Sequence, residues 1–382
     1  MMGSPQESSP RRRGTEVPLI VACCVLLVAV AAGGAALAFR SQGSSPNSTA
    51  GASPTPHLTP LALLGTTPAS GATGVAASES VNVELSTALA PSSPLPSFSP
   101  PVAGTWTRVS PDVLQFTPSG PFVPGTTENL VIPGGGLGMY AADGQRLPQS
   151  TTVTFTIAPG STLRLQQILA QLGYLPVAFS PTIPPTPAQE ANVQQGTFTW
   201  RWPLLPTSLT SQWVPGTDGV ITKGAIMRFE TTHALAIDGD AGPAVWSALL
   251  SAVIAGSGDP DPYDYVDVTK TSPETVHVYE NGAIVYTTPA NTGVAAAPTA
   301  TGTFPVFEHV QSATMTGTNP TGSHYVDPGI PWVSYFNGGD ALHGYVRASY
   351  GFPQSDGCVE MPPANAAVVW PLTPLGTLVT VQ

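Results

Sequence analysis

Prolines and glycines interrupt this chain so often that long regular helices have little room in it. The 382 residues include 43 prolines and 39 glycines, and only 9% of them are Asp, Glu, Lys or Arg. Proline and glycine favour turns, whereas long surface helices need charged faces. The chain is also long enough for two or three domains, each with its own core. We therefore expect a mainly β, multidomain protein.

An uncharged apolar run, residues 17–39, lies near the N-terminus. As a helix it would be about 34 Å long, which is enough to cross a bilayer. Three arginines, Arg11 to Arg13, precede the run, and only Arg40 follows closely. This bias predicts a cytoplasmic tail over residues 1–16, a single transmembrane anchor in the cell membrane, and an extracytoplasmic remainder in the cell wall space.

Two other interpretations of the apolar run remain open. The small residues Ala35 to Ala38 offer a site at which a signal peptidase could remove the segment. The sequence Ile20-Val21-Ala22-Cys23 resembles a lipid-attachment box, but almost no apolar residues precede it. We favour the uncleaved anchor.

Residues 40–73 are mostly Ser, Thr, Pro, Ala and Gly, with almost no charge. Such a composition cannot bury a core, so we expect a disordered linker. The net charge of the whole chain is −11, and no basic cluster lies beyond the first few residues. Phosphate binding needs clustered Lys and Arg, so no nucleic-acid partner is expected.

Short alternating apolar runs recur over residues 74–158, separated by turns rich in proline and glycine. Alternation with a period of two residues is typical of half-buried strands. We expect a small β-sandwich and take it to be a spacer without a ligand; residues 110–118 resemble bacterial Ig-like wall-protein modules. The residues expected in its interior are Val81, Val83, Leu85, Trp106, Val109, Leu114, Phe116, Val153, Phe155 and Ile157.

The pattern changes to helical spacing over residues 160–256. Helices are predicted around residues 165–172, 222–231 and 247–253, and Gly173 is a helix stop. Leu172-Gly173-Tyr174 and the turn Asp238 to Trp246 resemble a three-helix peptidoglycan-binding domain. The long segment that holds Trp200 and Trp202 departs from that pattern and puts any binding groove in doubt.

The last segment, residues 262–382, is again patterned as strands. Asn281-Gly282 lies between two strand-like runs, which is the strongest local hairpin signal. Cys358 is the only cysteine after Cys23 and Cys24. An unpaired cysteine in an exported protein is either a reactive thiol or a small buried apolar residue.

The residues around Cys358 favour the reactive thiol. A thiol needs a base to become a good nucleophile near neutral pH, and His343 lies a short distance upstream. Gly357 permits close approach of the backbone to a substrate, and its amide and that of Cys358 could face a developing oxyanion.

Together, the hairpin, residues 298–304, His343-Gly344 and Ser355 to Met361 resemble the YkuD-type L,D-transpeptidases. The resemblance implies a β-rich catalytic fold in which Cys358 attacks the diaminopimelate carbonyl of a donor tetrapeptide stem and releases D-Ala. His343 would be the base, and the carbonyl of Gly344 would orient its ring. A neighbouring stem's amine would then form a 3,3 cross-link. No metal or organic cofactor is implied, and carbapenems are the expected inhibitors.

Two positions depart from the family pattern. Asp356 stands where histidine is frequent, and Glu360 stands where Arg or Asn is frequent. A carboxylate beside the nucleophile disfavours thiolate unless it pairs with a cation, for which Arg347 is a candidate. We expect Ser355, Asp356, Glu360 and Tyr335 to bind substrate. His309, His324 and Asp340 lack compact ligand spacing, so no metal site is predicted.

Two alternatives to transpeptidation remain. An L,D-carboxypeptidase would use the same residues with water as the acceptor. A non-catalytic wall-binding protein would have a site that decayed through Asp356 and Glu360, although retention of both His343 and Cys358 argues against it.

Overall fold

A computed structural model describes residues 59–382. The predicted cytoplasmic tail, the apolar run 17–39 with Cys23, and most of the predicted linker lie outside the described residues. Within residues 59–382, no helix is both long and apolar enough to span a membrane.

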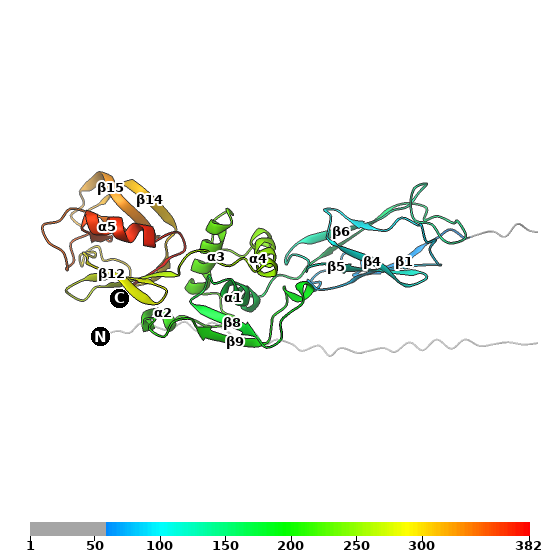
Figure 1. The fold of residues 1–382 in the computed structure, drawn as a ribbon. Coiled ribbons are helices and arrows are strands. Elements are labelled where there is room, and N and C mark those ends of the chain that lie inside the picture. The colour runs from blue at the N-terminus through cyan, green and yellow to red at the C-terminus, as the bar shows by residue number, and fades with distance from the viewer. Residues whose placement is uncertain (1–58) are drawn as a thin grey trace, which may run out of the picture. The chain divides into compact units, whose positions relative to one another are not determined.

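The first domain is a sandwich of two antiparallel sheets (Figure 1). One sheet has the order β1-β2-β5-β4, and the other has the order β3-β6-β7. Their strands are β1 (Leu63–Thr67), β2 (Val81–Leu85), β3 (Ser97–Phe98), β4 (Gly104–Ser110), β5 (Val113–Pro118), β6 (Thr127–Ile132) and β7 (Thr151–Thr156). The alternating residues of β2, β5 and β7 point inward and form one apolar core, as the period-two pattern predicts.

The prediction of a linker as far as residue 73 is wrong, because the sandwich begins earlier. Leu61 is fully buried in the core, and β1 pairs antiparallel with β2 through Leu63 and Leu85. The short alternation Leu61, Leu63 is enough to add an edge strand, although proline and threonine surround it.

Val109 was expected inside the sandwich but is 56% exposed. The β4–β5 register shifts between Arg108 and Ser110, and such a bulge turns the extra side chain out of the alternation. Trp106 is half-buried and packs against Phe116 with ring centroids 5.3 Å apart, so it covers the core from its margin.

The middle module contains the three expected helices, α1 (Thr162–Gln171), α3 (Val220–Thr232) and α4 (Pro243–Ala255). Ser161 caps α1 by accepting the Arg164 amide, and Gly173 follows with a φ of +89°, which favours glycine. The module is not purely helical. Its long inserted segment forms the hairpin of β8 (Val177–Pro181) and β9 (Gly196–Trp200), with the short helices η1 (Pro187–Gln189) and α2 (Thr207–Thr210).

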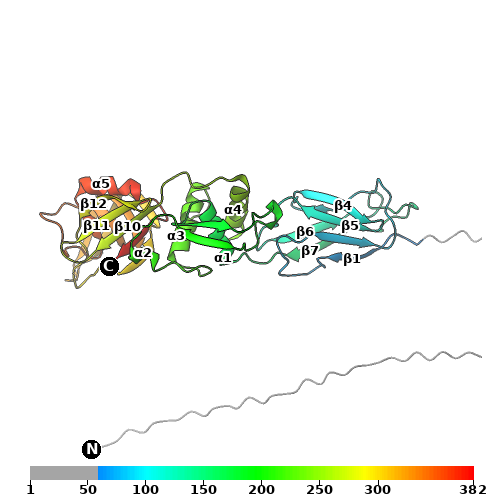
Figure 2. The same cartoon turned by 60° about the horizontal axis from the view of Figure 1, so that its bottom comes forward.

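The last domain has two sheets, and α5 (Pro363–Val369) with η2 (Trp370–Leu372) follows the second (Figure 2). The first sheet has the order β12-β11-β10-β18-β13, and the second has the order β14-β15-β16-β17. The first is built from β10 (Asp264–Thr269), β11 (Thr275–Glu280), β12 (Ala283–Pro289), β13 (Gly302–Pro305) and β18 (Leu378–Val381). The second is built from β14 (Glu308–Thr318), β15 (His324–Asn337), β16 (Asp340–Gly344) and β17 (Val359–Met361).

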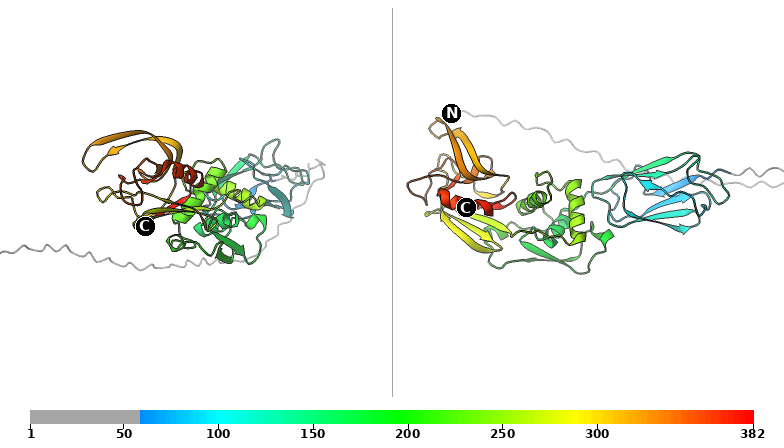
Figure 3. Two further views of the ribbon diagram at one scale, coloured as in Figure 1. Left: turned by 60° about the vertical axis from the view of Figure 1, so that its left-hand side comes forward. Right: turned by 45° about the horizontal axis from the view of Figure 1, so that its top comes forward.

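Two hairpins define the edges of this domain. The predicted hairpin joins β11 to β12, and Asn281 and Gly282 have φ values of +49° and +77°, as an Asn-Gly turn requires. The long β14–β15 hairpin extends away from the body of the domain (Figure 3). Sequence analysis did not identify this second hairpin, which contributes one wall of the candidate site.

Candidate active site

Parallel pairing of β16 with β17 brings the two predicted catalytic groups to one place. His343 lies on β16 opposite Glu360, and Cys358 immediately precedes β17. Both side chains line one pocket of about 250 Å³. The parallel register pairs residues 17 positions apart and so brings Cys358 near His343, which a sequence pattern alone does not reveal.

His343 is 3% exposed, and its Nδ1 lies 3.1 Å from the carbonyl oxygen of Gly344. A carbonyl can only accept, so Nδ1 carries the proton and donates it. Burial lowers the pKa of His343 below its usual value, and the Gly344 contact only partly offsets this. The ring is therefore neutral at neutral pH, with an unprotonated Nε2. The predicted orienting contact from Gly344 is present, and it leaves the ring in the form that a general base needs.

Cys358 is half-buried, and its Sγ donates to the carbonyl of Gly339 at 3.5 Å. Burial, together with the nearby carboxylates of Asp340, Glu360 and Asp356, raises the pKa of the Cys358 thiol to about 12. Within residues 59–382, no hydrogen bond joins Sγ to the imidazole of His343. The resting thiol is therefore protonated, and any attack by it would need a base to remove its proton.

The loop before β17 holds Cys358 through Ser355 and Gly357. The buried Ser355 hydroxyl donates to the Cys358 carbonyl and accepts the Gly357 amide at 3.3 Å. Gly357 has a φ of +121°, and a Cβ there would lie 2.7 Å from Asp340 Oδ1. The expectation that the Gly357 amide faces an oxyanion is wrong in this arrangement, because that amide is already donated. The amide of Cys358 remains the candidate oxyanion donor.

A polar scaffold that sequence analysis missed supports this loop. Glu274 is fully buried on the segment before β11, and its carboxylate accepts the Thr292 amide at 2.6 Å and the Thr292 hydroxyl at 2.8 Å. The Thr292 carbonyl accepts the amides of Gln354 and Ser355. Asn291 pairs with Glu360 through two backbone hydrogen bonds, each 2.9 Å long. No local motif marks these residues, since their partners come from distant parts of the sequence.

Glu360 is buried and forms a two-pronged ion pair with Arg347, in which Nε and Nη2 each lie 2.7 Å from a carboxylate oxygen. Arg347 also stacks on the ring of Tyr345 at 4.6 Å. The proposed pairing of Arg347 with Asp356 is therefore wrong, because Glu360 takes the guanidinium instead. Asp356 is exposed at the rim of the pocket.

The β14–β15 hairpin supplies the opposite wall of the pocket, through Met315, Asn319, Tyr325, Asp327 and Ile330. The predicted binding residues Ser355, Asp356 and Glu360 also line the pocket. Tyr335 does not: it packs in a small apolar cluster with Ile330, Val333 and Ala341, against which Cys358 also packs. The predicted role of Tyr335 as a substrate contact is therefore replaced by support of the wall behind the thiol.

The three residues considered for a metal site make separate contacts. His309 stacks on Trp370 at 4.1 Å, His324 contacts the Thr318 hydroxyl, and Asp340 accepts the Ala300 amide. No group of three His, Cys, Asp or Glu side chains within the described residues has the geometry of a metal site.

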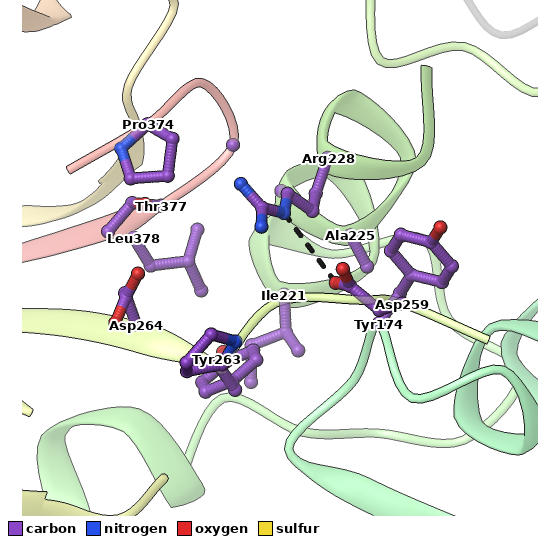
Figure 4. Close-up of a pocket in the computed structure, with 13 residues that line it drawn as sticks. Tyr174, Ile221, Ala225, Arg228, Asp259, Tyr263, Asp264, Pro374, Thr377 and Leu378 are labelled. Atoms are coloured by element: carbon purple, nitrogen blue, oxygen red, sulfur yellow. Dashed lines mark ion pairs between the residues drawn. The ribbon is translucent and has the colours of Figure 1, made fainter. Parts of the chain in front are cut away.

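A second pocket, drawn in Figure 4, has a volume of only about 20 Å³. It is lined by α3 residues around Arg228 and by Tyr263, Asp264 and Leu378, and Arg228 Nε lies 3.5 Å from Asp259. This volume suits about one water molecule. Neither a cysteine nor a histidine lines it, so it is not a second candidate site for activation of a thiol nucleophile.

Two family models match the chain. The YkuD model, the L,D-transpeptidase catalytic domain, matches residues 263–381, and the Big_5 model, a bacterial Ig-like domain, matches residues 58–157. No curated protein matches the chain.

Several solved structures of L,D-transpeptidases are similar to the chain. The enzyme from Mycobacterium smegmatis is 14% identical, over 85% of this chain and 100% of that one, with a TM-score of 0.29. L,D-transpeptidase 3 from Mycobacterium tuberculosis is 12% identical, over 84% of this chain and 98% of that one, also with a TM-score of 0.29. The catalytic domain of the E. faecium enzyme is 25% identical, over 31% of this chain and 96% of that domain, with a TM-score of 0.29.

The order of the motifs, the β-rich fold that carries them and the matching family models lead to one assignment. Residues 263–381 are an L,D-transpeptidase catalytic domain of the YkuD family, and a bacterial Ig-like domain precedes them in the chain.

Proposed function

We propose that the protein is a cysteine-dependent L,D-transpeptidase that forms 3,3 cross-links between peptidoglycan stem peptides. One observation carries this proposal. The Cys358 thiol and the buried, neutral imidazole of His343 line the same pocket of a YkuD domain. Neutral thiol and neutral base are the reactants that general-base activation of a nucleophile needs.

In the first half-reaction, Cys358 Sγ attacks the carbonyl of the third stem residue while His343 Nε2 takes the thiol proton. The amide of Cys358 faces the resulting oxyanion. The carbon–nitrogen bond to the terminal D-Ala then breaks, His343 returns the proton to the leaving amine, and a thioester remains on Cys358.

In the second half-reaction, the neutral side-chain amine of a neighbouring stem's diaminopimelate attacks the thioester. His343 takes a proton from that amine as the carbon–nitrogen bond forms. The carbon–sulfur bond breaks, and the thiol recovers its proton from His343. Water in place of the amine would give an L,D-carboxypeptidase from the same residues.

The proposed arrangement of the rest of the chain suits an immobile polymeric substrate. We propose that residues 17–39 anchor the protein in the cell membrane with the catalytic domain outside. Residues 40–58 and the Ig-like domain would give the anchored enzyme reach, which raises its effective concentration at the wall. Wall binding by the middle module is part of the same proposal.

Mass spectrometry of the full chain and its Cys358→Ala variant tests the proposal. Each is incubated with a carbapenem, whose strained lactam carbonyl acylates nucleophilic thiols, and separately with a tetrapeptide stem. We expect one adduct and release of D-Ala for the native chain and neither for the variant. Cross-linked and hydrolysed products then separate transpeptidase from carboxypeptidase. A folded native chain that gives neither adduct nor D-Ala would support the non-catalytic wall-binding alternative instead.

A further inference from the structure

The catalytic pocket has an unbalanced set of charges. Its lining includes three carboxylates, Asp327, Asp356 and Glu360, and one guanidinium, Arg347. Arg347 is bound by Glu360 through two hydrogen bonds of 2.7 Å. Among residues 59–382, no side chain forms an ion pair or hydrogen bond with the carboxylate of Asp327 or Asp356. A ligand in this pocket therefore meets two carboxylates that have no direct partner, whereas the guanidinium is already bound by Glu360.

The two aspartates come from opposite walls of the pocket. Asp327 lies on β15 opposite Met315, and Asp356 lies on the loop that carries Cys358. Tyr325 is two residues before Asp327, so it shares the same face of the strand. Gly317 makes room for its ring, because a Cβ there would lie 2.5 Å from the Tyr325 hydroxyl.

The environment of Tyr325 supports the placement of Asp327 and Asp356 on the same pocket. Burial raises the pKa of the Tyr325 hydroxyl, and the carboxylates of Asp356 and Asp327 raise it further. Tyr325 also lines the same pocket as both aspartates.

His343 independently marks where the reacting part of a ligand sits. It is 3% exposed, it lines the same pocket, and its Nε2 has no hydrogen-bond partner in the described chain. Nε2 is not among the buried polar atoms that lack a partner, so it is open to the pocket and can accept a proton from a ligand bound there. The proposed reaction brings the proton to this nitrogen when a substrate carbonyl is beside Cys358. The side chain of that residue would then lie in the same pocket, which Asp327 and Asp356 also line.

We infer, on the basis of the proposed function, that Asp327 and Asp356 recognise the side-chain ammonium group of the diamino acid whose carbonyl Cys358 attacks. The donor stem would accordingly be one that presents a free cationic amine at this side chain. The pocket disfavours a lone carboxylate there, because the guanidinium that would bind it is committed to Glu360.

Two matched stems test the inference: a tetrapeptide with meso-diaminopimelate and the same peptide acetylated on its side-chain amine. Release of D-Ala is measured in single turnovers, with the full chain in excess over the peptide. We expect the native chain to prefer the free amine about tenfold, as a charge-assisted hydrogen bond in a half-buried site allows.

Variants separate the effect of charge from the bulk of the acetyl group. In the Asp327→Asn/Asp356→Asn double variant, we expect the two peptides to react at rates within about twofold of each other. Glu308→Gln is the matched control, since Glu308 is an exposed carboxylate on β14 that does not line the pocket. This control should retain the native preference.

The rate of acylation by a penem whose only charge is its carboxylate should change in the opposite direction in the double variant. Removal of two negative charges should speed this reaction by about threefold or more, whereas structural damage would slow it. Equal rates for the two peptides with the native chain, or a preference that persists in the double variant, would overturn the inference. Failure of the proposed function would instead appear as no D-Ala from either peptide and no penem adduct.

Discussion

The Ig-like domain and the catalytic domain are both β-rich, but their interiors differ. The sandwich buries an apolar core with few polar residues, namely Ser93 and Glu128. The catalytic domain buries many more: Asp267, Glu274, Thr288, Asn291, Thr292, Thr299, Ser334, His343, Ser355, Glu360, Thr373, Thr377 and Thr380. Burial of a polar group costs free energy unless a partner satisfies it. The domain that holds the Cys358 loop and the His343 imidazole thus contains many buried polar groups, whereas the Ig-like domain contains few.

The largest expected effect is on the catalytic side of this comparison. His343→Ala removes the base while the thiol, with its raised pKa, stays protonated. We expect acylation by a carbapenem to slow by about 10²- to 10⁴-fold. Intact-protein mass against time measures the rate, and circular dichroism checks the fold. A rate within a few-fold of native would mean that another group takes the proton.

In the Ig-like domain, Leu114→Ala should act on stability alone. Leu114 is 1% exposed in the sandwich core, and its truncation should lower the free energy of unfolding of that domain by about 2–5 kcal/mol. Denaturant unfolding measures this change. The acylation rate should stay native at temperatures where the sandwich remains folded; a parallel loss of acylation would show that the spacer contributes to the site.

A matched pair of buried carboxylates sharpens the comparison. Glu274→Gln turns one acceptor of the Thr292 contacts into a donor, which should cost about 1–3 kcal/mol and loosen the Cys358 loop. We expect slower acylation and faster hydrogen exchange over residues 351–358. Glu128→Gln in the sandwich, where the carboxylate accepts the Thr126 hydroxyl, should leave acylation unchanged. Equal effects of the two changes on acylation would contradict the proposed scaffold.

The pH dependence of acylation should reflect the two shifted groups. Burial lowers the pKa of His343, so the base form persists at neutral pH and is lost only as the pH falls through that lowered value, below 6.5.

The Cys358 pKa of about 12 predicts little alkylation by iodoacetamide at pH 9 in the folded protein and rapid alkylation once it is unfolded. Peptide mapping measures the alkylation of Cys358 in the folded and in the unfolded protein. Fast alkylation of the folded protein would mean that a thiolate is already present.

The smallest effect is expected at Val109. Its side chain is 56% exposed because of the bulge in β4, so Val109→Thr should change the free energy of unfolding by less than about 0.5 kcal/mol. Denaturant unfolding with Val83→Thr as the buried counterpart provides the contrast. A loss of more than about 1 kcal/mol at Val109 would restore the original expectation that it belongs to the interior.

Local patterns predicted much of the fold. The period-two runs of β2, β5 and β7, the helical spacing of α1, α3 and α4, and the Asn281-Gly282 turn depend on neighbours in sequence. The errors share a cause. A one-residue bulge in β4 exposes Val109, and the first strand of the sandwich lies in a proline-rich stretch that does not look like a strand. Pairing with another strand determines both the bulge and the existence of β1.

The sequence by itself determined which reactive residue types are present and in what order: one thiol beyond the apolar run, a histidine upstream and a glycine before the cysteine. Only the tertiary structure decided the protonation states, the Arg347–Glu360 pair, the Glu274–Thr292 scaffold and the wall supplied by the β14–β15 hairpin. The physical reason is that burial and ion pairing arise between residues far apart in the chain. Residue types decide which groups could react, whereas desolvation and long-range contacts decide the protonation state of each group.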